Sequence, residues 1–176
     1  MFYAALVGGA LLWSTIAGRP LVQLLWTPAA NLRLLGVSLG AGLGFGLLIV
    51  ALSRLMVARL ASAQALYAWF AELLGPVSWT DALTLAALSA VGEEVFFRGA
   101  MQPSLGLLPT SLLFALVHWP PRLRFASWTI GAGIIGLAVG AITIHTGNLA
   151  GAIVAHFVVN LLNLRHVSQF VPKHSQ

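Results

Sequence analysis

Long apolar runs separated by short polar breaks dominate the chain as far as about residue 164. A helix that crosses the hydrocarbon core of a bilayer needs about 20 mainly apolar residues. Runs of that length, or slightly shorter, occupy residues 2–17, 34–52, 79–101, 104–118, 125–145 and 149–164. Because these runs are continuous rather than alternating, they predict membrane-spanning helices and not the strands of a β-barrel.

Two further segments are harder to place from the pattern. Residues 21–31 are too short to span a bilayer and carry prolines at their edges, which indicates a connector or an interfacial segment. Residues 60–74 are amphipathic and fit either a short span or an interfacial helix, and the pattern leaves both open. The expected fold is therefore an all-α polytopic transmembrane bundle of about six to eight helices.

A chain of 176 residues normally forms one domain, so we expect a single membrane domain over residues 1–176. Within it, residues 79–164 are expected to form the core, with the helices of residues 2–74 accessory to it. Residues 165–176 are expected to form a polar, frayed tail. The run at residues 2–17 lacks the basic segment that precedes the core of a signal peptide, so we expect it to be retained.

Small residues spaced four apart predict close helix packing. Gly40 with Gly44 and Gly42 with Gly46 form two such pairs in one apolar run. Gly136 and Gly140 have the same spacing in a later run.

Composition supports the membrane interpretation. Hydrophobic residues make up 59% of the chain and charged residues 7%, whereas a soluble domain has about 25% charged residues. The net charge of +5 comes from basic residues spread between the apolar runs, so we expect a lipid bilayer as partner and no nucleic acid. The absence of cysteine excludes disulfides, thiolate zinc sites and a cysteine nucleophile.

The basic residues also predict an orientation. If about seven segments span the bilayer, Arg54 and Arg59 lie on one side, and the other side holds Arg19, Arg33, Arg122, Arg124, Arg165 and Lys173. An excess of basic residues marks the cytoplasmic side, so we expect a cytoplasmic C-terminus. The expected location is the bacterial cytoplasmic (inner) membrane, as a multi-pass integral protein.

A few ionisable or polar side chains interrupt the apolar runs: Glu93, Glu94, Arg98, His118, His145, His156 and Asn160. Charges at bilayer depth cost several kcal/mol each, so they occur mainly where they face the protein interior and serve a function. Glu94 and Arg98 are four residues apart, share a helix face and can pair. His156 and Asn160 have the same spacing, as do Phe114 and His118.

This pairing separates the expected roles of the two glutamates. Arg98 would hold Glu94 ionised, whereas Glu93 projects about 100° away around the helix and is free to act as a general base. A histidine of another helix would hold a water beside Glu93, and a second histidine with an asparagine would donate to an oxyanion. These groups suffice for attack of water on an amide. Each feature alone also fits a structural role.

Three motifs therefore stand in order on successive apolar segments: Glu93-Glu94-x-x-x-Arg98, Phe114-x-x-x-His118 and His156-x-x-x-Asn160. They match the EExxxR, FxxxH and HxxxN motifs of the CPBP family, the CAAX-protease and bacteriocin-processing (Abi) intramembrane proteases. Over about residues 79–164 the chain resembles that family.

The resemblance implies a glutamate-dependent intramembrane endopeptidase. In it, Glu93 would be the general base, His118 would help to activate the water, and His156 and Asn160 would stabilise the oxyanion. Glu94 and Arg98 would organise the site. His145 has no counterpart in the motifs, and we expect it to be structural.

No cofactor is expected, with zinc kept as an alternative. Glu93, His118 and His156 would be the ligands of an open catalytic zinc site, but the chain lacks the HExxH spacing of many zinc proteases.

The expected partner is a membrane-anchored protein or peptide, cut in CAAX-type processing or in the removal of a C-terminal sorting signal. Two alternatives from other classes are a non-catalytic bacteriocin-immunity protein and a proton- or ion-coupled carrier.

Overall fold

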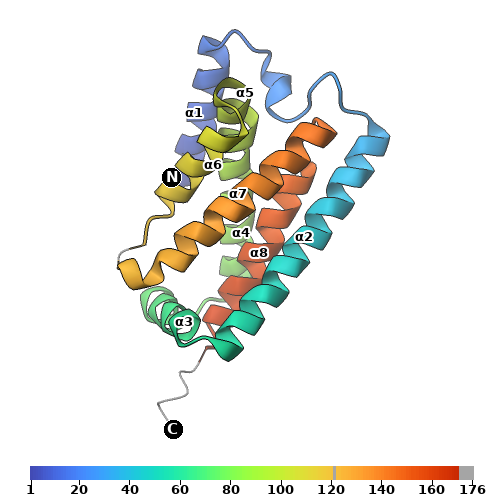
Figure 1. Ribbon diagram of the computed structural model, residues 1–176. Coiled ribbons are helices and arrows are strands. Elements are labelled where there is room, and N and C mark those ends of the chain that lie inside the picture. Colours follow the sequence, from blue (N-terminus) through green and yellow to red (C-terminus); the bar gives the residue numbers. More distant parts are fainter. Residues whose placement is uncertain (121, 171–176) are drawn as a thin grey trace.

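The computed structural model describes residues 1–120 and 122–170, and every regular element in this part of the chain is helical (Figure 1). The elements are α1 (Phe2–Ile16), η1 (Leu21–Leu24), α2 (Leu32–Arg59), α3 (Ala61–Leu74), α4 (Trp79–Glu94), η2 (Val95–Met101), α5 (Gln102–Leu105), α6 (Leu107–Val117), η3 (Leu123–Phe125), α7 (Ala126–Thr146) and α8 (Ala150–Val167). Helices α4, η2 and α5 follow one another without a break and form one rod, residues 79–105. The predicted all-α bundle is confirmed.

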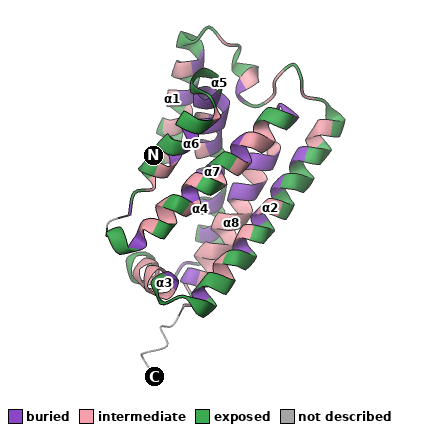
Figure 2. Cartoon of the chain, viewed as in Figure 1, coloured by how far each residue is buried: buried purple, intermediate pink, exposed green. Residues whose placement is uncertain are grey.

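The bundle is apolar on the outside and has polar groups inside. Three helical segments are long and apolar enough to cross a membrane: α2, α8 and the segment Leu123–Thr146, which contains α7. Helices α1 and α6 are shorter apolar helices. Leucines such as Leu43 and Leu47 are exposed on α2, while Glu94 and Arg98 are buried, and Figure 2 shows the exposed residues along the outer helix faces. The chain is a membrane protein.

Close packing of α2 against α8 uses only one of the two predicted glycine pairs of α2. A Cβ atom at Gly42 would lie 2.1 Å from the carbonyl oxygen of Gly151, and one at Gly46 would lie 3.0 Å from that of Ala155. Nothing lies within 4 Å of the corresponding positions at Gly40 and Gly44. The two pairs therefore differ in which face of α2 they occupy, which their spacing could not reveal.

Helix α4 begins with a side-chain cap. The Ser78 hydroxyl accepts a hydrogen bond from the Asp81 amide at 3.1 Å and donates one to the Asp81 carboxylate at 2.6 Å. The carboxylate in the first turn also suits the positive end of the helix dipole. Asp81 therefore stabilises the start of α4.

The sequence predicts that this helix ends before Pro103, and that prediction is wrong. The backbone changes to a π-helix at η2 and the rod continues to Leu105. Pro103 is the second residue of α5, just after the π-helix. Arg19 Nη2 donates to the carbonyl oxygen of Ala100 at 2.6 Å and to Ser104 Oγ at 2.8 Å. The segment after α1 thus supplies a partner for the irregular backbone of the rod.

Helix α3 lies across one end of the bundle and is seen almost end-on in Figure 1. It packs Ala63 and Tyr67 against Val57 of α2 and Val167 of α8. The position of α3 favours an interfacial helix over a short membrane span, the two interpretations that the sequence left open for residues 60–74.

The placement of α3 corrects the predicted distribution of basic residues. The C-terminal ends of α2 and α8 and the N-terminal end of α7 lie at the same end of the bundle as α3 (Figure 1). That end carries Arg54, Arg59, Arg122, Arg124 and Arg165. The opposite end carries Arg19 and Arg33. With this distribution the positive-inside tendency still predicts a cytoplasmic C-terminal end of α8, and this orientation stays a prediction.

The last helix runs further than predicted. Residues 165–167 belong to α8, where Arg165 donates to the carbonyl oxygen of Val77 and stands 4.4 Å from the centroid of the Trp79 ring. Arg165, the first residue of the tail that the sequence predicts to be frayed, is therefore held in place by contacts with α4 and the residue before its cap. The end of that tail, residues 171–176, lies outside the described residues.

We expect Gly42→Ala to destabilise the protein by about 1–3 kcal/mol, because the new methyl group would overlap backbone atoms of Gly151. Gly44→Ala is the matched control, since its methyl group would meet open space. Thermal unfolding in detergent measures both variants. Equal melting temperatures for the two would contradict the close contact between α2 and α8 at Gly42.

Candidate active site

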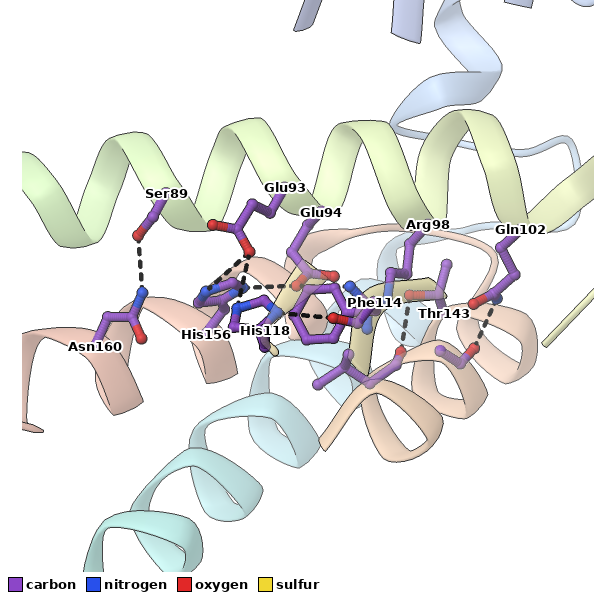
Figure 3. A network of polar contacts seen from close by, with 12 residues as sticks. Ser89, Glu93, Glu94, Arg98, Gln102, Phe114, His118, Thr143, His156 and Asn160 are labelled. Carbon is purple, nitrogen blue, oxygen red and sulfur yellow. Dashed lines mark hydrogen bonds and ion pairs between the residues drawn. The ribbon is translucent and has the colours of Figure 1, made fainter. Parts of the chain in front are cut away.

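Five ionisable side chains, carried by three helical segments, meet between α4, α6 and α8 (Figure 3). They are Glu93, Glu94, Arg98, His118 and His156. The first three come from the α4–η2 rod, His118 stands at the C-terminal end of α6, and His156 comes from α8. The structure thus brings together five of the six residues that the sequence predicts for the site.

Glu94 and Arg98 form the buried part of this cluster. Arg98 Nη1 donates to Glu94 Oε1 at 3.2 Å, and the two side chains are 0% and 1% exposed. The guanidinium lies over the Phe114 ring, 4.2 Å from its centroid, which adds a cation–π contact. The predicted pairing of Glu94 with Arg98 is confirmed, and the FxxxH phenylalanine proves to contact the arginine.

Hydrogen bonds at Nδ1 fix how both histidines present Nε2. His118 Nδ1 is 2.7 Å from the carbonyl oxygen of Phe114, and His156 Nδ1 is 2.7 Å from Glu94 Oε1. A carbonyl or carboxylate oxygen only accepts, so each Nδ1 carries the hydrogen. In the neutral ring, Nε2 is then an acceptor.

Both Nε2 atoms face Glu93. His118 Nε2 lies 3.7 Å and His156 Nε2 lies 3.9 Å from Glu93 Oε2. These distances are too long for direct hydrogen bonds, and Glu93 Oε2 has no hydrogen-bond partner among the described residues. Three acceptors that face one another need a donor between them, and a water molecule supplies two hydrogens. The arrangement can therefore bind and orient a water.

The accessibility of the cluster differs between its two carboxylates. The Glu93 side chain is 12% exposed and that of His118 is 21% exposed, whereas Glu94 is 1% exposed. Glu93 therefore forms the reachable edge of the cluster, and the Glu94–Arg98 ion pair lies behind it.

Asn160 lies beside this network rather than within it. Its Nδ2 donates to Ser89 Oγ at 2.8 Å, and Ser89 is one helical turn before Glu93 on α4. Sequence reasoning missed Ser89, although its spacing of four from Glu93 was a signal that the two share a helix face. His145 is exposed at the end of α7 and belongs to none of these contacts.

As they lie, the two imidazoles stand somewhat further from Glu93 than two ligands of one zinc ion do. Two ligands of a tetrahedral zinc ion stand about 3.3 Å apart when each is about 2.0–2.1 Å from the metal, and both Nε2 atoms are further than that from Glu93 Oε2. Among the residues that the structure describes, no group of three or more His, Asp or Glu could hold a metal ion.

We expect Glu94→Gln to lower the stability of the folded protein by about 3 kcal/mol, because it removes the paired counter-ion of the buried Arg98. Glu93→Gln is the matched control on the adjacent position, where no arginine is paired. Thermal unfolding of both purified variants in detergent tests this. A larger loss of stability in Glu93→Gln than in Glu94→Gln would contradict the assigned ion pair.

Known proteins resemble this chain over the segment that contains the site. Residues 75–162, half of the chain, match the family described as type II CAAX prenyl endopeptidase Rce1-like, and the match includes all six predicted site residues. The chain is 35% identical over 79 residues to the uncharacterized protein YpbD of Bacillus subtilis (strain 168). That alignment covers 43% of this chain and only 40% of the Bacillus protein. No solved structure matches. The chain belongs to the Rce1-like family of type II CAAX prenyl endopeptidases, a family of proteases, as its three motifs predict.

Proposed function

We propose that this protein is an intramembrane endopeptidase that hydrolyses a peptide bond of a membrane-associated protein or peptide. The observation that carries the proposal is the position of Glu93, which faces the Nε2 atoms of His118 and His156 from two other helices. A carboxylate with two facing imidazoles is a set of groups that can orient a water and remove its proton.

In the proposed reaction, Glu93 accepts a proton from a water while the water oxygen attacks the carbonyl carbon of the substrate. His118 Nε2 accepts a hydrogen bond from the hydrogen that stays on the water oxygen and fixes its direction, since the Phe114 carbonyl oxygen holds the ring through Nδ1. The tetrahedral intermediate collapses when the C–N bond breaks. Glu93 then returns its proton to the amine that leaves.

The oxyanion requires N–H donors, which the resemblance assigns to His156 and Asn160. The Nδ1 hydrogen of His156 is already bonded to Glu94, so His156 can donate from Nε2 only when its ring carries both protons. The Glu94 carboxylate stabilises that charged ring. Asn160 has two amide hydrogens and uses one of them for Ser89, which leaves the other for the substrate.

We assign the substrate to a membrane-anchored protein or peptide, because the outer surface of the bundle is suited to the bilayer. On α4, for example, Leu88 and Val91 are 51% and 44% exposed, on the side of the helix away from Glu93. A substrate that reaches Glu93 must approach a protein whose surroundings are apolar. CAAX-type processing and removal of a C-terminal sorting signal are the two candidate reactions. The location is the bacterial cytoplasmic membrane, with the arginine-rich end of the bundle on the cytoplasmic side.

Glu93→Gln and His118→Ala are expected to lower kcat by about 10²–10⁴-fold, the usual contribution of a general base or its partner. His145→Ala should leave kcat unchanged, because this histidine is exposed and outside the site. The assay is cleavage in proteoliposomes of two tagged peptides, one prenylated at a CAAX end and one with an apolar C-terminal sorting tail. Unaltered cleavage by folded Glu93→Gln would refute the proposed function.

The purified active protein is expected to contain much less than one zinc ion per chain and to keep its activity in the presence of a chelator, because the proposed reaction needs only Glu93, the histidines and a water. Elemental analysis and cleavage assays with a chelator test this. Stoichiometric zinc, with activity lost to the chelator and restored by zinc, would show that Glu93, His118 and His156 rearrange around a metal.

A further inference from the structure

A cavity of about 220 Å³ adjoins the site at Arg98 and extends along the rod away from Glu93. Arg98, Gln102 and Gly106 line it from the rod side, and Glu93 does not line it. The segment from Gln23 to Thr27 and the turn between α7 and α8 form its other walls. The cavity therefore lies towards the end of the bundle that is opposite to α3 (Figure 1).

Two glycines of α7 make room for polar side chains at this place. A Cβ atom at Gly136 would lie 3.1 Å from Arg98 Nη2, and one at Gly140 would lie 2.5 Å from Gln102 Oε1. Gln102 Nε2 donates to the carbonyl oxygen of Gly140 at 3.0 Å (Figure 3). The pair that the sequence assigned to general helix packing thus accommodates Arg98 and Gln102.

A row of buried polar atoms runs from the cavity to the site. Among the described residues, these atoms have no hydrogen-bond partner: Gln102 Oε1, Arg98 Nε and Nη2, Ser111 Oγ, Glu94 Oε2 and Glu93 Oε2. Ser111 lies beside Arg98, since its Cα and Arg98 Nη2 both border Gly136. Buried polar groups are nearly always hydrogen-bonded to protein or water, so this row requires partners.

The chemistry of the row identifies the partner. Arg98 Nε and Nη2 only donate, so their partner must accept. Gln102 Oε1 only accepts, and its orientation is set by the bond from Nε2 to Gly140, so its partner must donate. A carboxylate or phosphate can do the first but not the second, and Glu93 and Glu94 would repel it. Water does both.

We propose that the cavity at Gln102 and Arg98 is a water-binding site from which the hydrolytic water reaches Glu93, along Arg98, Ser111 and Glu94. This inference rests on the proposed peptidase function. It separates two routes. The peptide reaches the exposed edge of the cluster at Glu93, and water arrives through the interior from the cavity, which Glu93 does not line.

A unique thiol in the cavity tests the water route. Thr143 lines the cavity, and its hydroxyl already donates to the carbonyl oxygen of Val139 at 3.0 Å, so Thr143→Cys leaves the row intact. The chain has no cysteine of its own. The full-length variant in proteoliposomes is treated with 2-aminoethyl methanethiosulfonate, a cationic reagent that reacts with thiols in contact with water. Intact mass gives the labelled fraction, and cleavage of the same tagged peptide gives kcat and KM before and after labelling.

We expect the thiol to be labelled, kcat to fall to about a tenth or less of its unlabelled value with KM unchanged, and a reducing agent to restore it. Gln169→Cys is the control, because this position is exposed beyond the end of α8 and labelling there should not change kcat. Ile144→Cys, which also lines the cavity, replaces Thr143→Cys if the latter is inactive before labelling.

An unreactive thiol would show that the cavity holds no water and would overturn the inference. Labelling without loss of kcat would mean that water reaches Glu93 elsewhere, and a rise in KM alone would mean that the cavity binds substrate. Failure of the peptidase proposal is distinguishable, because it would appear as cleavage that does not depend on Glu93, while the labelling would still report whether the cavity is wet.

Discussion

The ion pair between Glu94 and Arg98 is the interaction on which this structure depends. An unpaired charge at this depth would cost several kcal/mol, so each charge must meet a partner within the protein. The rod carries the ion pair, and three other helices surround it. Helix α8 contributes a hydrogen bond from His156, α6 contributes the Phe114 ring, and α7 leaves room for the guanidinium at Gly136. The helices must converge here, and their convergence also places the histidines around Glu93.

The N-terminal helices support the rod directly. A Cβ atom at Gly92 would meet Tyr3 of α1 at 3.0 Å, and one at Gly99 would meet the carbonyl oxygen of Leu24 at 2.5 Å. Arg19 adds its hydrogen bond to Ala100. The region that the sequence predicts to be accessory therefore contacts the rod on both sides of Arg98, and it also forms a wall of the cavity. Substitutions there can alter the site without touching a motif.

Local periodicity explains which parts of this protein can be read from its sequence. Most helices follow from apolar runs, and the Glu94–Arg98 pair follows from a spacing of four residues on a helix face. The π-helix at η2 could not be predicted, because an apolar run does not distinguish it from an α-helix, and Arg19, which donates to its Ala100 carbonyl, is far away in sequence. The choice between Gly40–Gly44 and Gly42–Gly46 depends on where α8 lies. No pattern in the sequence indicated a role for Gln102, since it donates to the backbone carbonyl of Gly140 on another helix and lines a cavity that several segments form.

The π-helix has a geometric consequence for the rod. In an α-helix with 3.6 residues per turn, every fourth residue is displaced by about 40° around the axis. Residues 94, 98 and 102 would therefore turn progressively away from any one neighbour. A π-helical turn contains more residues, so a step of four falls short of a full rotation and the displacement reverses. The wide turns at η2 shift the angular phase of the rod back, and on this stretch Arg98 and Gln102 both reach α7, at Gly136 and Gly140.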